Sequence, residues 1–246
     1  LGQALSAAQQ TVVAERDVHS FHSYFLRPGD VKHPIVYKVD VIRDGKGFST
    51  RRVEAIQHGK TIFYLTASFQ IEEQGVNHQA KMPDVTGPEQ LISELEFARA
   101  NQDLIPPSIR DKFTCDKPIE IRPVELINPL KPEVLPPHRH IWLKANGEVP
   151  DNIATHKFLL AYASDFNFLT TALQPHGRSF MDPSMQVATI DHSIWFHRPF
   201  KFDDWLLYQI DSPSASGARG LVRGQLFNRE GVLEASCVQE GVLRFK

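Results

Sequence analysis

The chain has 246 residues and a formal net charge of -2, from 27 Lys and Arg against 29 Asp and Glu. This balance, without a long run of one sign, gives no electrostatic footprint for nucleic acid or an anionic membrane surface. No apolar run reaches the ~20 residues of a membrane span. Cys115 and Cys237 fit neither a disulfide framework nor a metal motif. We therefore expect a cytoplasmic protein without nucleic-acid or membrane partners.

The N-terminal part of the sequence predicts a helix followed by an antiparallel sheet. Apolar residues recur at helical spacing from Gln3 to Val13. Turn-forming residues at 44–47 and 58–60 separate runs rich in β-branched and aromatic residues, as in short hairpins. The expected strands are Val18–Leu26, Pro34–Arg43, Phe48–Gln57 and Thr61–Ile71. We assign residues 1–72 to a first structural unit.

Residues 73–116 predict a connector, because the strand pattern is lost there. Scattered Pro and Gly accompany two short helical pieces, near Glu89–Asn101 and Ser108–Phe113. Residues 117–246 then predict a second unit with the plan of the first. Its expected strands are Pro118–Val124, His140–Lys144, Gln186–Phe196, Trp205–Asp211, Gly220–Phe227 and Val232–Phe245.

The stretch Asp151–Thr171 organises the second unit. It is apolar on nearly every side and has the length of a helix, which indicates a buried helix. Asp151 and Asn152 are good N-cap residues. One acid, Asp165, lies within this apolar run. A buried carboxylate needs partners, so Asp165 is either a hydrogen-bonded structural acid or a functional one.

The two units also share short sequence patterns. His22 to Pro28 and His192 to Pro199 both contain His-Ser, an aromatic pair and Arg-Pro, with one extra residue in the second copy. Two units, each a helix with a meander of strands, indicate a duplication. The helix then has a natural position inside a curved sheet.

Four motifs in this arrangement resemble those of the acyl-CoA thioesterase II family, over essentially the whole chain. They are His19 to Asp30, Tyr162 to Asp165, Ala188 to Phe200 and Val238 to Gly241. The resemblance implies an α+β double hotdog fold, in which each of two repeats wraps a curved antiparallel sheet around a central helix. It also implies hydrolysis of acyl-CoA thioesters to free CoA and a carboxylic acid. Family members carry a strand and a Gly-rich helix start ahead of the residues matching Gly2 to Leu5, and we expect these to be missing from the first repeat.

The family's catalytic residues match Asp165, Thr189 and Gln239. On regular strands Thr189 shares a face with Val187 and Asp191, and Gln239 shares one with Cys237 and Gly241, so both can point toward the helix. We expect Asp165 to accept a proton from a water that Thr189 and Gln239 hold and that attacks the thioester. Direct attack by Asp165 stays open. No organic cofactor or metal is implied.

Rival assignments are weaker. No Gly-x-Ser-x-Gly elbow is present, and the alternating apolar strand around Cys237 places this thiol in the core. No Cys or third ligand is placed near His138 with His140 or near His192 with His197, so these pairs do not predict a metal site. Adjacent residues on a strand face opposite ways, so Asp191-His192 is expected to be structural.

Two other functions stay open. One is a hotdog hydratase or dehydratase, although His156 lies about 13 Å from Asp165 along a helix. The other is a module that binds acyl-CoA without turnover. By analogy with the family we also expect a homo-oligomer, a dimer or tetramer.

Overall fold

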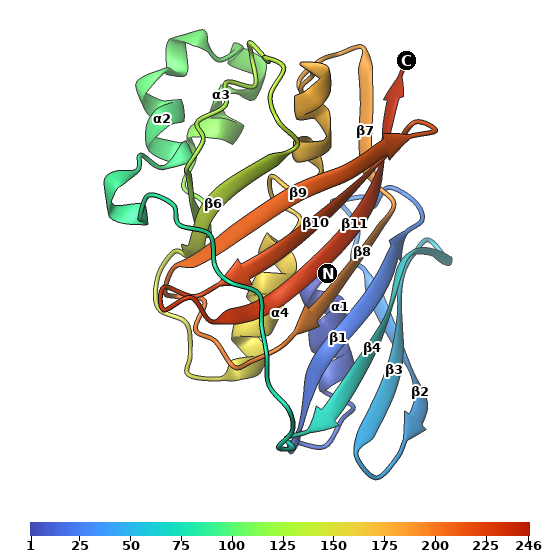
Figure 1. The fold of residues 1–246 in the computed structure, drawn as a ribbon. Coiled ribbons are helices and arrows are strands. Elements are labelled where there is room, and N and C mark those ends of the chain that lie inside the picture. The colour runs from blue at the N-terminus through green and yellow to red at the C-terminus, as the bar shows by residue number, and fades with distance from the viewer.

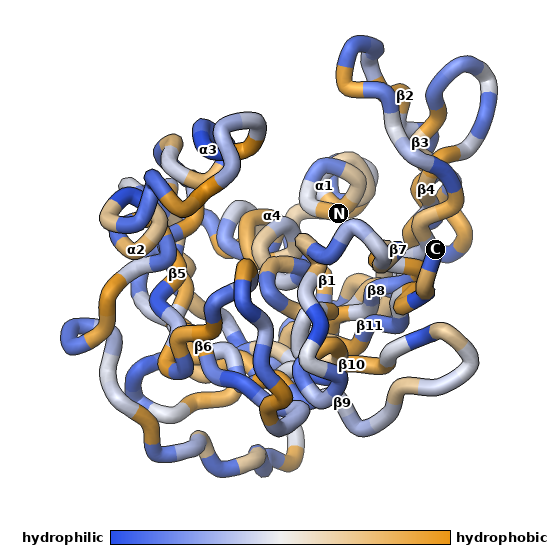
Figure 2. The backbone as a smooth tube through the Cα atoms, turned by 90° about the horizontal axis from the view of Figure 1, so that it is seen from above, coloured by the Kyte–Doolittle hydropathy of each residue, from blue (hydrophilic) through white to orange (hydrophobic).

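A single curved sheet dominates the structure, a computed structural model that describes residues 1–246. Eleven strands form this sheet, in the order β2-β3-β4-β1-β8-β11-β10-β9-β6-β5, with β7 paired to the end of β11. Helices α1 and α4 pack against each other on one face of it (Figures 1 and 2). None of the helices is both long enough and apolar enough to cross a membrane.

The first unit contains one helix and four strands. They are α1 (Gly2–Gln9), β1 (Arg16–Phe25), β2 (Val36–Asp44), β3 (Phe48–Gln57) and β4 (Lys60–Ile71). Helix α1 buries Ala4, Leu5 and Ala8 against the sheet and α4. It ends at Gln9, before the predicted end at Val13. Just after the helix, the Thr11 hydroxyl donates a hydrogen bond to the Ala8 carbonyl at 2.8 Å. Such local bonds and β-branched residues disfavour a continued helix.

The second unit repeats this plan with additional elements. Its strands are β5 (Ile119–Pro123), β6 (His138–Ala145), β7 (Met185–Thr189), β8 (Asp191–Phe196), β9 (Leu206–Ser216), β10 (Arg219–Phe227) and β11 (Leu233–Phe245). Between the units lie α2 (Glu94–Ala100) and α3 (Pro107–Thr114), with 3₁₀ turns at Pro88–Gln90 and Gln102–Leu104. In Figure 1, α2 and α3 lie beside the end of the sheet that β5 and β6 form.

Strand pairing and a buried lysine both join the units. Strands β1 and β8 pair antiparallel, from Ser20 opposite Trp195 to Tyr24 opposite Asp191, which makes the sheet continuous. The buried Lys157 of α4 donates from Nζ to the Val18 carbonyl of β1 at 2.9 Å. The central helix of the second unit is therefore attached to the first unit through a strand as well as through α1.

The structure corrects the prediction of one long helix over Asp151–Thr171. Helix α4 spans only Ile153–Ala163, after an N-cap in which Asn152 accepts from the Ala154 N–H at 2.9 Å. A turn follows, in which Asn167 has a left-handed φ of 59°, and a 3₁₀ helix then covers Leu169–His176. Helix α4 has already ended at Ala163, and the left-handed Asn167, a conformation that Asn tolerates, prevents the chain from continuing as a right-handed helix to Thr171. Burial of the helix is also incomplete, because Tyr162 is 47 % exposed.

The predicted strand Gln186–Phe196 is likewise interrupted. Strands β7 and β8 both pair with β11, but Thr189 lies opposite Gly241 whereas Ser193 lies opposite Val238. The register therefore shifts by one residue at Ile190 and Asp191. A shift of this kind is a β-bulge, which disturbs the regular alternation of side chains.

A close contact between β10 and Tyr208 of β9 connects the sheet to the end of α4. Tyr208 is fully buried, and its hydroxyl donates to the Ser164 carbonyl at 2.8 Å. Its ring covers Gly224, where a Cβ atom would overlap the ring and lie 3.1 Å from Cys237 Sγ. A side chain at position 224 therefore requires Tyr208 to move.

We predict that Gly224→Ala lowers the free energy of unfolding by about 1–3 kcal/mol, the usual cost of overpacking a tight core. Urea unfolding followed by circular dichroism measures this change. Gly75→Ala is the control, since no heavy atom lies within 4 Å of the added Cβ; it should change stability by less than about 0.5 kcal/mol. Equal stability of the two variants would contradict the packing argument.

Candidate active site

The structure brings Asp165, Thr189 and Gln239 together in one chain of hydrogen bonds. The Gln239 amide donates from Nε2 to Thr189 Oγ1 at 3.0 Å, and the Thr189 hydroxyl donates to Asp165 Oδ1 at 3.2 Å. Gln239 is fully buried, while Asp165 and Thr189 are half-buried. The three side chains predicted from the sequence therefore form one contiguous site at the edge of the core.

Three separate elements supply these side chains. Asp165 lies on the turn after α4, Thr189 ends β7, and Gln239 lies in the middle of β11. Backbone pairing of Thr189 with Gly241 places Thr189 two residues from Gln239 along β11. Gln239 shares its inward face with the buried Cys237 and Gly241, as strand alternation predicted.

His192 extends the hydrogen-bond chain behind Gln239. Its Nδ1 lies 2.5 Å from Gln239 Oε1, and its Nε2 lies 2.9 Å from Ser164 Oγ. The Gln239 carbonyl oxygen can only accept, so Nδ1 carries the hydrogen. Nε2 then faces the Ser164 hydroxyl, whose one hydrogen also has the Ala161 carbonyl oxygen as an acceptor at 3.1 Å. His192 thereby fixes which way the Gln239 carboxamide points, with its NH₂ group toward Thr189.

The bulge explains why the sequence did not predict this histidine. Residues 189 and 192 are three apart, and on a regular strand they would point to opposite faces. The register shift at Ile190 and Asp191 places both side chains on the inner face, where each contacts Gln239. Asp191 instead accepts a hydrogen bond from the Glu240 backbone N–H at 2.8 Å, which holds the bulge. The sequence analysis expected a structural role for His192 and did not place it against Gln239, which the structure does.

The donors in this chain all point one way. Hydrogens run from His192 to Gln239, then to Thr189, and end on the Asp165 carboxylate, which accepts. Asp165 Oδ2 has no hydrogen-bond partner in the protein and remains available to accept from a water or a substrate. Burial lowers the pKa of His192, an effect partly offset by Gln239 and Asp165, so the imidazole is neutral at pH 7.

Comparisons with known proteins agree with this arrangement. The family described as acyl-CoA thioesterase matches residues 108–242, and its N-terminal domain matches residues 1–70. Acyl-CoA thioesterase 2 of Haemophilus influenzae is 46 % identical over 100 % of this chain and 86 % of its own length. Human acyl-coenzyme A thioesterase 8 is 40 % identical over 100 % of this chain and 79 % of its own.

The chain belongs to the acyl-CoA thioesterase family. It is a thioester hydrolase, as the sequence predicted. The crystal structure of an acyl-CoA thioesterase II, TesB2, from Mycobacterium marinum superposes with a TM-score of 0.81 at 36 % identity, over 100 % of this chain and 87 % of that one. A hot dog fold protein from Alicyclobacillus acidocaldarius, at 17 % identity, superposes with a TM-score of 0.77 over 100 % of this chain and 85 % of that one. The predicted double hotdog fold is thus confirmed.

Two other side chains that could take part in catalysis, Cys237 and His156, are held in the core. The Cys237 thiol is buried 2.8 Å from the Tyr208 hydroxyl, and burial raises its pKa to about 12, so it is not a thiolate. His156 is also buried, and its Nδ1 accepts from the Phe202 N–H at 2.9 Å. Both act as core residues.

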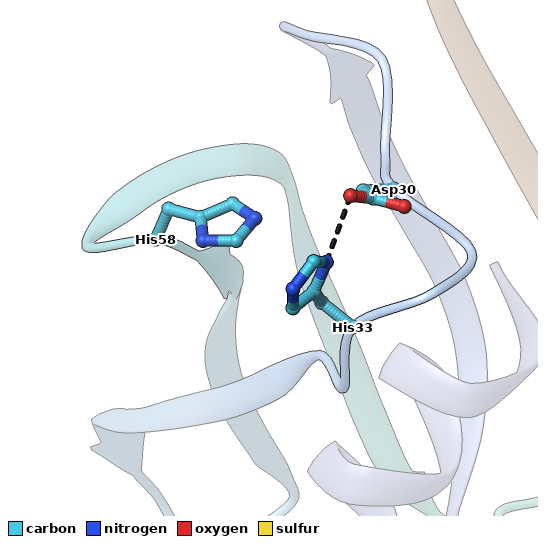
Figure 3. Close-up of side chains that lie close together, drawn as sticks. All are labelled: Asp30, His33 and His58. Carbon is cyan, nitrogen blue, oxygen red and sulfur yellow. Dashed lines mark hydrogen bonds and ion pairs between the residues drawn. The ribbon is translucent and has the colours of Figure 1, made fainter.

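One group of possible metal ligands lies outside the site. Ligand atoms of Asp30, His33 and His58 lie within 4.8 Å of one another, and all three residues are exposed (Figure 3). His33 Nδ1 and Asp30 Oδ2 form a hydrogen bond of 2.8 Å. Gln57, at the end of β3, holds the Asp30–His33 turn through three hydrogen bonds. This geometry is explained by the hydrogen-bonded turn alone.

Burial of neutral His192 predicts a loss of stability in mild acid. Below an ordinary pKa near 6.5 the unfolded chain binds a proton at this position that the folded chain does not. The free energy of unfolding should therefore fall as pH decreases below about 6.5, by up to about 1.4 kcal/mol per pH unit from this residue.

Urea unfolding between pH 7 and pH 5 measures this slope. His192→Asn has no proton to bind, so its slope should be smaller than that of the wild type by up to about 1.4 kcal/mol per pH unit. His19 and His197, whose pKa values are also lowered by burial, are present in both proteins and cancel in the difference. Identical slopes would show that His192 is accessible to protons in the folded state.

Proposed function

We propose that this thioesterase hydrolyses acyl-CoA by means of a water that Asp165 activates, with Thr189 and Gln239 positioning the carboxylate and the water. The one-way hydrogen-bond chain that ends on Asp165 carries this proposal. Thr189 occupies Oδ1 of the carboxylate and leaves Oδ2 for the water. The substrate class comes from the family, and the assignment of roles comes from the geometry.

The chemical step follows from these contacts. A water hydrogen-bonded to Asp165 Oδ2 transfers a proton to it while its oxygen attacks the thioester carbonyl carbon. The tetrahedral intermediate then collapses, the C–S bond breaks, and CoA leaves as the thiolate, which takes up a proton to become the thiol. Asp165 releases its proton and the acid product is a carboxylate. General-base assistance of this kind contributes roughly 10²–10⁴-fold to a rate.

The hydrogen-bond chain also has capacity to hold the water. Thr189 Oγ1 accepts from Gln239 with one lone pair and retains a second, and the Gln239 NH₂ group has a second hydrogen. A fixed acceptor and donor of this kind orient the water before reaction and avoid the cost of reorganising it during reaction. Burial of Gln239 supports this role, because a buried amide in a fixed network is rigid.

Direct attack by Asp165 is the alternative use of the same carboxylate. Attack by Asp165 would form a mixed anhydride, and hydrolysis at the aspartyl carbon would leave the first product without oxygen from the solvent. In a single turnover in H₂¹⁸O, unlabelled acid together with ¹⁸O in Asp165 would show direct attack followed by hydrolysis at the aspartyl carbon. Labelled acid excludes that route and is the result expected for water attack.

The other functions fit the contacts less well. A hydratase needs a histidine free to exchange a proton with substrate, but both ring nitrogens of His192 are engaged and His156 is buried. A binding module would not need a carboxylate aligned by two polar side chains. Neither function accounts for the hydrogen-bond chain.

The proposed reaction also bears on the cofactor requirement and the cellular compartment. Reaction with water needs no organic cofactor, and both cysteines are free thiols, which suits the reducing cytoplasm.

Homo-oligomer formation remains a prediction. Support comes from the edge strand β2, which exposes Val36, Val41 and Ile42 at 61 %, 59 % and 53 %.

Replacement of the proposed base tests the mechanism. Asp165→Asn keeps the size of the side chain but removes the acceptor charge, so kcat should fall at least roughly a hundredfold. Release of CoA thiol from a panel of short- to long-chain acyl-CoAs measures this and the preferred chain length. Asp116→Asn, at a side chain that is 91 % exposed, is the control and should retain full activity. Equal rates for both variants would remove Asp165 from the mechanism.

A double-mutant cycle tests whether His192 acts through Gln239. His192→Phe removes the hydrogen bond to the carboxamide, so kcat should fall more than KM changes, and His192→Asn, which keeps a donor, should recover part of the loss. In a Gln239→Ala background His192→Phe should cost much less, because there is no carboxamide left to orient. Equal effects in both backgrounds would mean that His192 has only a structural role.

A further inference from the structure

A cavity separate from the candidate active site, called here the second cavity, lies between the connector helices and the turn after α4. Its volume is about 210 Å³, and none of the three proposed catalytic residues lines it. Its walls come from α2, α3, the segment after β5 and the 3₁₀ helix that follows Asp165, in the region where Figure 1 shows α2 and α3 beside β6. By comparison, an engineered apolar cavity of about 150 Å³ binds benzene.

The mouth of this cavity is apolar. Leu104, Leu126, Leu130 and Phe180 line it and are 68 %, 49 %, 43 % and 48 % exposed. They come from distant parts of the chain and gather around one opening. An exposed apolar cluster of this kind, around a cavity, is typical of a ligand site.

The floor is a buried cation with few partners. Arg139, on β6, is 6 % exposed, and its Nε–H is buried without a hydrogen-bond partner. Its hydrogen bonds are two long ones from Nη1, to Asn167 Oδ1 at 3.2 Å and to Thr170 Oγ1 at 3.4 Å. It forms no ion pair in the protein. A buried guanidinium stays charged and is costly without an anion, so the floor has the chemistry of a carboxylate site.

Two carboxylates, Glu94 and Glu125, act electrostatically on Arg139 without forming an ion pair with it, so they offset its charge only in part. Glu125 is itself held by the backbone N–H and ring of His140. Glu94 contacts Asn167, whose Nδ2 donates to Glu94 Oε1 at 2.9 Å, and not Arg139 directly. Burial raises the pKa of Glu94, although Arg139 and Asn167 act in the opposite direction. Arg178, at the cavity wall, forms an ion pair with Asp182, with 3.0 Å between Nη1 and Oδ2. Arg139 is therefore the cation left for a ligand.

We propose that this cavity binds a medium-chain carboxylate head first, with the carboxylate on Arg139 and the alkyl chain along the apolar mouth. An apolar rim above a cationic floor selects an amphiphile, since a simple anion gains nothing from the rim and an alkane gains nothing from Arg139. Thioester hydrolysis produces molecules of this class, so only the origin of the ligand rests on the proposed function. Asn167 joins the floor to the turn that carries Asp165.

Octanoate is the probe for this site. Isothermal titration calorimetry on the intact chain should give saturable binding, and 1-octanol, which lacks the carboxylate, should bind at least about tenfold more weakly. Arg139→Leu should weaken octanoate binding at least about tenfold. Leu130→Asp places a negative charge at the exposed mouth and should do the same without disturbing the core. Val134→Asp, at a 74 % exposed position outside the cavity lining, is the matched control and should leave the affinity within about twofold.

Asp165→Asn distinguishes this cavity from the catalytic site and should retain octanoate binding. Loss of binding in Asp165→Asn with retention in Arg139→Leu and Leu130→Asp would place octanoate in the catalytic site and overturn the inference. Absence of binding, or equal binding by all variants, would also overturn it. Neither result bears on the hydrolytic mechanism, which the thiol-release assay tests separately.

Discussion

Pairing between β1 and β8 is the constraint on which the rest of the structure depends. A strand inside a sheet must satisfy its backbone groups on both sides, and these two strands do so across the boundary between the units. The two repeats therefore share one sheet, and their helices α1 and α4 share one concave face. The buried Lys157 strengthens the link, because its ammonium needs the Val18 carbonyl of the other repeat.

The active-site geometry depends on an irregularity within that regular sheet. Strand β11 pairs with both β7 and β8, and the shift of register between them turns Thr189 and His192 toward the same Gln239. Without the bulge, one of these two side chains would face away from the site. Bulges commonly occur next to active sites for this reason.

Two buried polar side chains beside the turn after α4, Gln239 and Arg139, differ in how many of their hydrogen-bonding groups have partners. Gln239 has a donor on one side and an acceptor on the other, which gives a rigid and specific network. Arg139 has long bonds and an unpartnered Nε–H. The turn from Ser164 to Asn167 contacts Arg139 directly and Gln239 through His192, since Asn167 bonds to Arg139 and Ser164 bonds to His192. One short segment thus connects the catalytic network to the second cavity.

Much of the fold follows from the sequence alone. Alternating residues and turn chemistry predicted β1, β3, β4, β10 and β11 closely, because each strand buries one face and is bounded by turn-forming residues. Four quoted motifs indicated the family and matched Asp165, Thr189 and Gln239, which the structure brings into contact. Patterns of this kind depend on neighbours in sequence and on periodicity, and a single chain displays both.

Tertiary structure decided the rest. The left-handed Asn167 ends the apolar stretch that reads as one long helix, and the bulge at Ile190 reverses the expected direction of His192. Neither has a periodic signal, because each arises where one element must fit against another. Arg139 precedes the predicted strand His140–Lys144 and carries no distinguishing signal in the sequence. Only the packing of the connector and the α4 turn around it shows a buried, underpaired charge. The sequence determined which residues could do chemistry, and the fold determined which of them meet.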